Sequence, residues 1–232
     1  MLVQTRSSVD ETRDFLATAA STDFIAGVVG WVDLTDPGIA ENLDAIRGWP
    51  GGALLVGVRH QVHDEPDPDW LLRPEVQRGI AAVGRAGLAY DLLVRARELP
   101  AAAATVRRNP DVRFVVDHLA KPRIAGGPVD PPWEAGLRPL AEVHNVFCKL
   151  SGMVTEADWA AWKPADLSPY IGKALAWFGP ERCMFGSDWP VCLLAAGYGQ
   201  VLAALEEALT GLNEADRARV LGGTAEEFYR LG

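Results

Sequence analysis

The sequence contains few cysteines, and none of them occurs in a Cys-x-x-Cys pair. There are three in 232 residues, Cys148, Cys183 and Cys192. An odd number of thiols cannot be fully paired in disulfides, which is typical of a reducing compartment. Cys148 and Cys183 lie inside apolar runs, where a thiol usually serves as a small buried hydrophobe. We therefore predict a cytoplasmic protein with structural cysteines.

The sequence also lacks long apolar runs and an excess of positive charge. No uninterrupted apolar run reaches the roughly 18 residues of a membrane span. The first twenty residues carry Arg6, Asp10, Glu11 and Arg13 where a signal peptide would be apolar. Lys and Arg total 22 against 31 for Asp and Glu, and the net charge of −9 would repel a phosphate backbone or an anionic bilayer. These absences predict no nucleic-acid partner and no membrane partner.

Short apolar, β-branched runs alternate with longer segments of helical period. This alternation predicts βα units around a parallel sheet. Several runs are continuously apolar, as expected for strands that helices cover. The seven predicted strands are residues 2–4, 27–34, 56–60, 88–94, 113–118, 146–151 and 182–187.

Helix signals fill the intervals between these runs. Ser8 and Glu11 have the spacing of a capping box that opens a helix through about Ala20. Pro74 suits the first turn of a helix, and Gly87 is placed to end it. Further helices are predicted from Pro100 to Arg108 and over 133–143, 167–178, 201–209 and 214–220. No linker interrupts the series, so residues 1–232 are predicted to form one domain, either a barrel or an open doubly wound sheet.

Polar residues recur where the predicted strands end. Arg59 and His60 end one run, Asp117 and His118 another, and Asp188 follows the last. The active site of a parallel barrel lies at the carboxyl ends of its strands, so this recurrence favours a barrel with chemistry at that edge. One such residue alone would only mark where a strand meets water.

These strand ends belong to a longer series of motifs, which runs over essentially the whole chain: GVVGWVDL (27–34), GVRH (57–60), YDLL (90–93), VDHLAKP (116–122), VFCKLSG (146–152), MFGSDWP (184–190) and GGTAEEFY (222–229). The series resembles the amidohydrolase-related (amidohydrolase type 2) family, in the branch of sugar-acid lactonases such as fuconolactonases and of pyrone-dicarboxylate lactonases. The resemblance implies a (β/α)8 TIM-type barrel. It also implies a hydrolase of the ester bond in a sugar-acid or related carboxylate-bearing lactone, with a small molecule as its partner.

The resemblance assigns the catalytic roles to two residues. Asp188 corresponds to the aspartate that takes a proton from the attacking water, and His118 to a histidine at a strand end. His118 either binds one divalent ion, zinc or a similar metal, or polarises the substrate carbonyl in metal-independent members. If a metal is bound, His118 and Asp188 are its expected ligands.

Other strand-end residues are predicted to bind the substrate. Arg59 has a planar guanidinium suited to a carboxylate or to sugar oxygens, with a salt bridge at the barrel mouth as the alternative. His60, Lys121, Trp189 and Trp31 are predicted to line the same pocket.

Two other aspartates in these motifs, Asp91 and Asp117, are not expected to line the pocket. Asp91 is predicted inside the barrel. Strand alternation predicts that Asp117 points outward, opposite to His118.

One family feature is missing from the sequence. Members open with a strand that bears His-x-His, whereas this chain has no such pair and begins with a segment like the family's second strand. We therefore expect an N-terminally truncated barrel of seven strands with an exposed seam, which could drive homo-oligomerisation. Three interpretations remain: a truncated lactonase, a related barrel hydrolase or decarboxylase, and a short chain that is a catalytically impaired binding module or assembles with a partner that supplies the strand.

Overall fold

The computed structural model describes residues 1–125, 127 and 129–232, and its centre is one parallel sheet. The strands are β1 (Leu2–Val3), β2 (Val28–Gly30), β3 (Leu55–His60), β4 (Ala89–Leu92), β5 (Arg113–Val116), β6 (Val146–Leu150) and β7 (Cys183–Phe185). They lie side by side in chain order. A doubly wound sheet would reverse its strand order at a switch point, so this order excludes that alternative. All seven predicted strands are confirmed.

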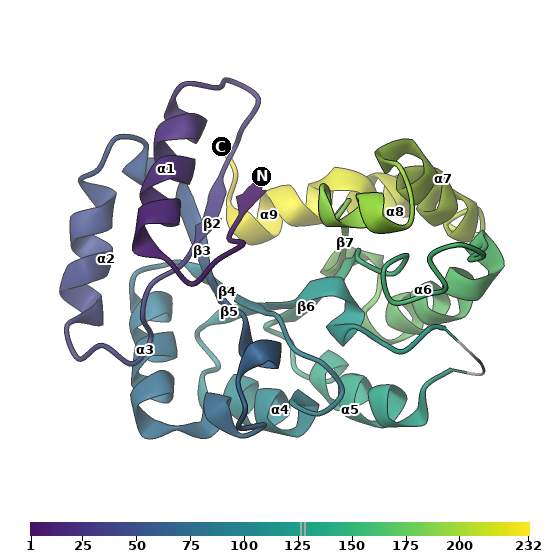
Figure 1. Ribbon diagram of the computed structural model, residues 1–232, viewed down its shortest axis with the longest axis horizontal. Coiled ribbons are helices and arrows are strands. Elements are labelled where there is room, and N and C mark those ends of the chain that lie inside the picture. Colours follow the sequence, from purple (N-terminus) through teal and green to yellow (C-terminus); the bar gives the residue numbers. More distant parts are fainter. Residues whose placement is uncertain (126, 128) are drawn as a thin grey trace.

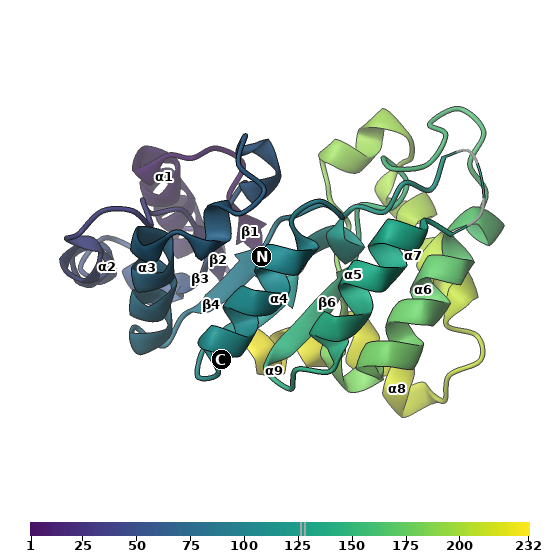
Figure 2. The same ribbon diagram turned by 90° about the horizontal axis from the view of Figure 1, so that it is seen from below.

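Helices follow the strands and cover the outer face of the sheet, which curls into a partial barrel (Figure 1). Figure 2 shows α4, α5 and α6 side by side along this face. The helices are α1 (Val9–Ala20), α2 (Ile39–Arg47), α3 (Pro74–Arg85), α4 (Leu99–Arg108), α5 (Pro131–Ala141), α6 (Pro164–Phe178), α7 (Tyr198–Ala208), α8 (Glu214–Ala218) and α9 (Thr224–Tyr229). The α/β barrel type is confirmed, and the described residues show no pairing of β7 with β1.

The start of α1 differs in part from the predicted capping box. Ser8 caps the helix as expected, since its hydroxyl accepts from the Glu11 amide at 3.4 Å. The Glu11 carboxylate does not return to Ser8, whose amide already donates to the Arg6 carbonyl at 2.8 Å. It accepts instead from the amides of Thr5 and Arg6 at 2.8 and 3.0 Å. Glu11 therefore fixes the loop that joins β1 to α1.

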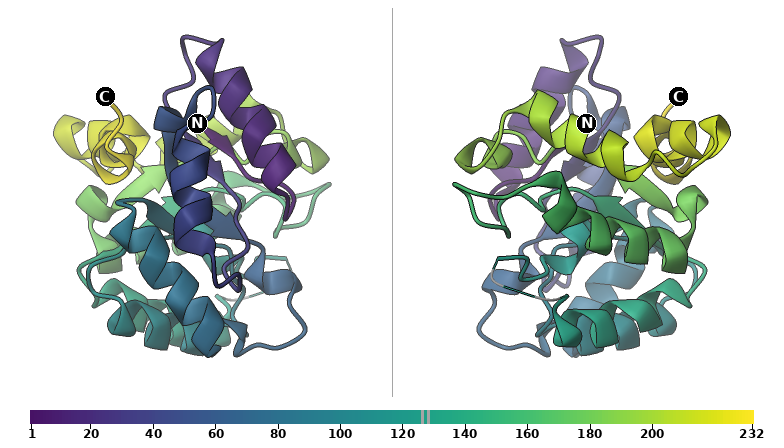
Figure 3. Two further views of the ribbon diagram at one scale, coloured as in Figure 1. Left: turned by 90° about the vertical axis from the view of Figure 1, so that its left-hand side faces the viewer. Right: turned by 90° about the vertical axis from the view of Figure 1, so that its right-hand side faces the viewer.

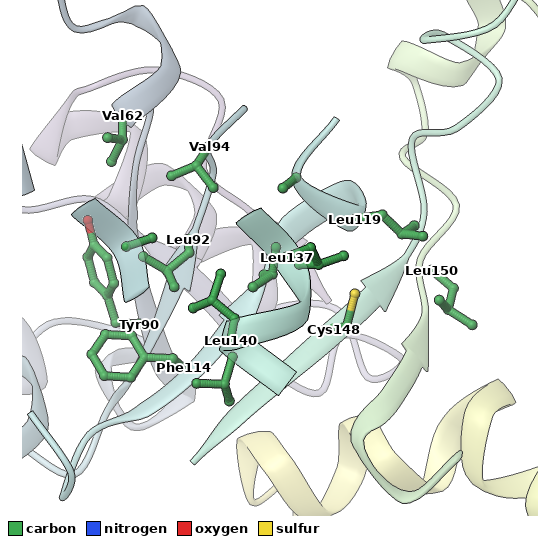
Figure 4. Close-up of a cluster of buried hydrophobic side chains, with 14 of the residues drawn as sticks. Val62, Tyr90, Leu92, Val94, Phe114, Leu119, Leu137, Leu140, Cys148 and Leu150 are labelled. Atoms are coloured by element: carbon green, nitrogen blue, oxygen red, sulfur yellow. The ribbon is translucent and has the colours of Figure 1, made fainter. Parts of the chain in front are cut away.

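The main core lies between the sheet and the outer helices (Figure 4). Phe114 and Cys148 project from β5 and β6 toward Leu137 and Leu140 of α5, and all four are fully buried. Cys183 and Cys192 are also buried, and none of the three thiols is paired. The cysteines are small apolar side chains, as predicted. Within the described residues, no helix has the length and apolar character needed to cross a membrane.

The inner face of the sheet packs against α9, on the side opposite α5 (Figures 1 and 3). Phe228 and Tyr229 form a second buried cluster with Val29, Ala89, Val115 and Met184. The Phe228 ring lies 4.7 Å from that of Phe147 on β6. The last helix thus fills the space inside the curl and connects strands that are far apart in the sheet.

Phe228→Ala should destabilise the fold strongly, because the removed ring would leave a cavity inside the curl of the sheet. We expect a loss of about 3–5 kcal/mol in the free energy of unfolding, measured by urea denaturation. Phe24→Ala is the matched control, because Phe24 is 87% exposed and should change stability by less than about 0.5 kcal/mol. Equal effects of the two substitutions would contradict the packing role of α9.

Candidate active site

Three polar side chains meet where β5, β6 and β7 end: His118, Ser151 and Asp188. The backbone bends sharply at two of these points. His118 to Lys121 have positive φ angles of 50 to 58°, and Asp188 has a φ of 55°. Non-glycine residues in this left-handed region are strained, and such strain concentrates at functional sites. The turns aim His118 and Asp188 toward each other.

His118 lies between Ser151 and Asp188. Its Nδ1 is 2.8 Å from the Ser151 hydroxyl oxygen, and its Nε2 is 3.5 Å from Asp188 Oδ1. The second carboxylate oxygen, Oδ2 of Asp188, is buried and has no hydrogen-bond partner among the described residues. Gly152 is required beside them, because a Cβ there would lie 2.7 Å from the His118 ring, at a φ of 63°.

Burial shifts both catalytic candidates toward their neutral forms. It raises the pKa of Asp188 to about 6, although the nearby Lys121 charge opposes this shift. Burial lowers the pKa of His118 to about 3, against the opposing effect of the Asp117 carboxylate. At pH 7 to 8 the site therefore holds a neutral imidazole next to a carboxylate of raised basicity. This pair can accept a proton from water and polarise a carbonyl.

A chain of buried charges lies beside the pair. Lys149 Nζ contacts Asp91 Oδ2 at 2.5 Å and Asp117 Oδ1 at 2.7 Å. Arg59 contacts the other Asp117 oxygen at 2.7 Å, and the Tyr229 hydroxyl donates to Asp91 at 2.7 Å. Burial alone would raise the pKa of Asp117, but Lys149 and Arg59 hold it well below its usual range. Burial raises the pKa of Asp91.

The prediction that Asp117 points outward is wrong. Asp117 is fully buried in this ion-pair network, on the same inner side as Val115. Strand alternation does place Asp117 opposite to the next side chain, but β5 ends at Val116 and the left-handed turn at His118 returns the imidazole to the inner side. The interior position predicted for Asp91 is confirmed.

Arg59 forms the salt bridge that was the alternative to substrate binding. Its Nη1 pairs with Asp117, its Nε donates to the Gln4 side chain at 3.0 Å, and its Nη2 donates to the Gln4 carbonyl. Substrate contact would have to compete with these bonds. The substrate-binding role of Arg59 stays a prediction.

The other predicted substrate-binding residues occupy different surroundings. The indole of Trp31 donates to Nδ1 of His60 at 3.0 Å, and His60 Nε2 lies 2.7 Å from Glu65. Lys121 pairs with Glu156 at 2.7 Å. Trp189 is 62% exposed. The sequence reasoning gave Ser151 and Lys149 no role in the site, although both lie in a strand-end motif that it singled out.

The described residues do not complete a zinc site. They include no group of three or more His, Cys, Asp or Glu side chains arranged to hold a metal ion. His118 Nε2 and Asp188 Oδ1 are two suitable donors, but catalytic zinc ions commonly have three protein ligands.

A protein-family model described as Amidohydrolase matches residues 3–231. The chain belongs to the amidohydrolase family. It is 42% identical to an L-fucono-1,5-lactonase of Burkholderia multivorans and 40% identical to one of Burkholderia ambifaria. The matches cover 99% and 100% of this chain and 79% of each relative. The chain is therefore a hydrolase of this family, as its motifs predicted.

The fold agrees with a solved amidohydrolase from Burkholderia multivorans, crystallised with bound zinc. The TM-score is 0.93 at 40% identity, over 99% of this chain and 82% of that one. The structural match confirms the barrel type.

Lys149→Met should destabilise the fold, because it leaves Asp91 and Asp117 buried together without their shared cation. Removing one member of a buried ion pair costs about 3–5 kcal/mol, measurable by urea denaturation. Lys173→Met is the matched control, since Lys173 pairs with Glu134 at 2.8 Å near the surface and should change stability by no more than about 1 kcal/mol. A Lys149→Met protein as stable as this control would show that the ion pairs of Lys149 add little to the stability of the fold.

Proposed function

We propose that this amidohydrolase hydrolyses a sugar-acid lactone, with Asp188 as general base and His118 as the group that polarises the carbonyl. The observation that carries the proposal is the largely desolvated Asp188 carboxylate, with its Oδ2 buried, beside the neutral imidazole of His118. The names of the two Burkholderia relatives support L-fucono-1,5-lactone as the first substrate to test.

The reaction uses the two oxygens of Asp188 differently. Oδ2, which is free of protein partners among the described residues, accepts a proton as water attacks the lactone carbonyl. His118 donates a hydrogen bond from Nε2 to the carbonyl oxygen, where negative charge develops. The ring C–O bond then breaks, and Asp188 returns the proton to the departing alkoxide. One water is consumed, a hydroxy acid forms, and the carboxylate is regenerated.

Charged and aromatic groups near the mouth would bind the sugar-acid part. Lys121 lies close enough to Asp188 for its charge to affect that pKa, so it is suited to attract the carboxylate of the product. Trp189 offers an exposed ring that can pack on a sugar face. We also assign Trp31 and His60, which are hydrogen-bonded to each other, to the substrate pocket. Arg59 holds Asp117, and any contact of Arg59 with the substrate has to compete with its bonds to Asp117 and Gln4.

The proposal is tested by adding L-fucono-1,5-lactone to the purified protein and following acid release at constant pH. Hydrolysis above the spontaneous rate is expected. No step requires a metal ion, so the rate should persist after EDTA treatment. Absence of hydrolysis for fucono-, rhamnono- and galactonolactones would overturn the substrate class. A rate that depends wholly on added zinc would contradict the proposal that His118 polarises the carbonyl without a metal ion.

Asp188→Asn should abolish hydrolysis without weakening the fold. The amide keeps the shape of the side chain but cannot accept the proton, so kcat should fall by roughly 10²–10⁴-fold. The raised pKa means that Asp188 adds stability at low pH that is lost as pH rises through about 6. At pH 8 the variant should therefore melt at the parent's temperature or higher. A lower melting temperature with kcat within a few-fold of the parent would make Asp188 a structural residue.

The rate should depend on the ionisation of Asp188. The base works only as a carboxylate, and its pKa of about 6 predicts that kcat/KM rises about tenfold per pH unit below 6 and levels off above about 7. Initial rates from pH 4.5 to 8, corrected for spontaneous hydrolysis, measure this profile. Half-maximal activity near pH 4, the value of an exposed aspartate, would contradict the burial of the base.

A further inference from the structure

Ser151 contacts the catalytic imidazole but has no role in the proposed chemistry. It follows β6 directly, is 1% exposed, and places its hydroxyl oxygen 2.8 Å from Nδ1 of His118. We propose that Ser151 is a positioning residue: its hydroxyl donates to Nδ1 and so holds His118 as the tautomer with the proton on Nε2. This inference rests on the proposed function, because it specifies how His118 comes to present a donor there.

The direction of this hydrogen bond follows from the groups on both sides of the ring. A neutral imidazole has one N–H, and a carboxylate can only accept. Nε2 faces Oδ1 of Asp188 at 3.5 Å, so electrostatic attraction favours the proton on Nε2. Nδ1 is then a lone-pair acceptor. A serine hydroxyl can donate or accept, and next to such a nitrogen it must donate.

The packing around His118 restricts the orientation of its ring. Gly152 packs directly against the imidazole, where even a Cβ would approach to 2.7 Å. Gly186, after β7, packs against Ser151 in the same way, because a Cβ there would lie 3.0 Å from the Ser151 Cβ. The two glycines therefore fix serine and imidazole between neighbouring strand ends. The opposite tautomer would turn a lone pair toward Asp188 and toward the substrate oxygen, and could not stabilise an oxyanion.

The tautomer can be read without any substrate. In ¹⁵N-labelled protein at pH 7.5, proton couplings to the ring nitrogens distinguish a protonated from an unprotonated nitrogen. The His118 signals are assigned by their loss in His118→Gln. We expect His118 to show an unprotonated Nδ1 and a protonated Nε2. A proton on Nδ1 would overturn the proposal whether or not the protein hydrolyses lactones, whereas an inactive parent with the expected tautomer would overturn only the function.

The kinetics of Ser151→Ala then test whether the tautomer of His118 matters for catalysis. Loss of the donor should mix the two tautomers in the NMR spectrum and lower kcat by about tenfold, which corresponds to one hydrogen bond of about 1.4 kcal/mol. KM should stay within about twofold, because the Ser151 hydroxyl is buried and directed at the imidazole. Ser151→Thr retains the hydroxyl and should recover the Nε2–H tautomer and most of kcat.

Ser168→Ala is the matched control. Its hydroxyl donates to the Pro164 carbonyl at 3.0 Å in the first turn of α6, outside the His118–Asp188 pair. It should leave both kcat and the His118 spectrum unchanged. An unchanged kcat and tautomer in Ser151→Ala would overturn the positioning role, as would a loss of kcat that Ser168→Ala reproduces to the same extent.

Discussion

The buried ion pairs around Asp117 are the interaction on which the site depends. Asp117 follows β5, Lys149 lies on β6, and Arg59 lies on β3. Through Asp91 of β4 the network also reaches Tyr229 of α9, which fills the inside of the curl. Charges of opposite sign thus connect β3 with the end of β5, and β6 with both β4 and the end of β5. Buried ion pairs add little net stability, because desolvation offsets their attraction, but a broken pair is costly. The network therefore fixes the relative positions of the strand ends more than it stabilises the fold.

This arrangement also sets the electrostatics of the catalytic pair. Asp117 is adjacent to His118 in the chain, and its negative charge raises the pKa values of both His118 and Asp188. Arg59 acts in the opposite direction on both groups. These opposing influences leave burial as the largest effect on each residue. The result is a carboxylate with raised basicity and an imidazole that stays neutral, although the groups lie only 3.5 Å apart.

The strands could be predicted from the sequence because their signals are local, and the meeting of His118 with Asp188 followed from their places at strand ends. Apolar runs mark each strand, and His118 and Asp188 stand directly after two of them. Helix α2 was not predicted, although Ile39, Leu43 and Ile46 have the spacing of a buried helical face. The inner position of Asp117 was mispredicted because the left-handed turn begins at His118 and brings that imidazole to the same side, and no glycine in the sequence indicates this turn. The salt bridge that was the alternative to substrate binding joins Arg59 to Asp117, and a contact between residues 58 positions apart gives no local signal in the sequence.

The regular barrel around the strained turns after β5 and β7 explains how the fold holds the Asp188 carboxylate with a buried Oδ2 and no cation in direct contact among the described residues. Burying Asp188 without a cation in direct contact disfavours its charged form, and positive φ angles at His118 and Asp188 add further cost. Neither feature would persist in an isolated loop. Each turn directly follows a strand that is hydrogen-bonded within the sheet, and the ion pairs of Arg59 and Lys149 hold Asp117 next to the first turn. The regular part of the barrel thus supplies the stability that the site lacks, and the desolvated Asp188 carboxylate keeps its raised pKa.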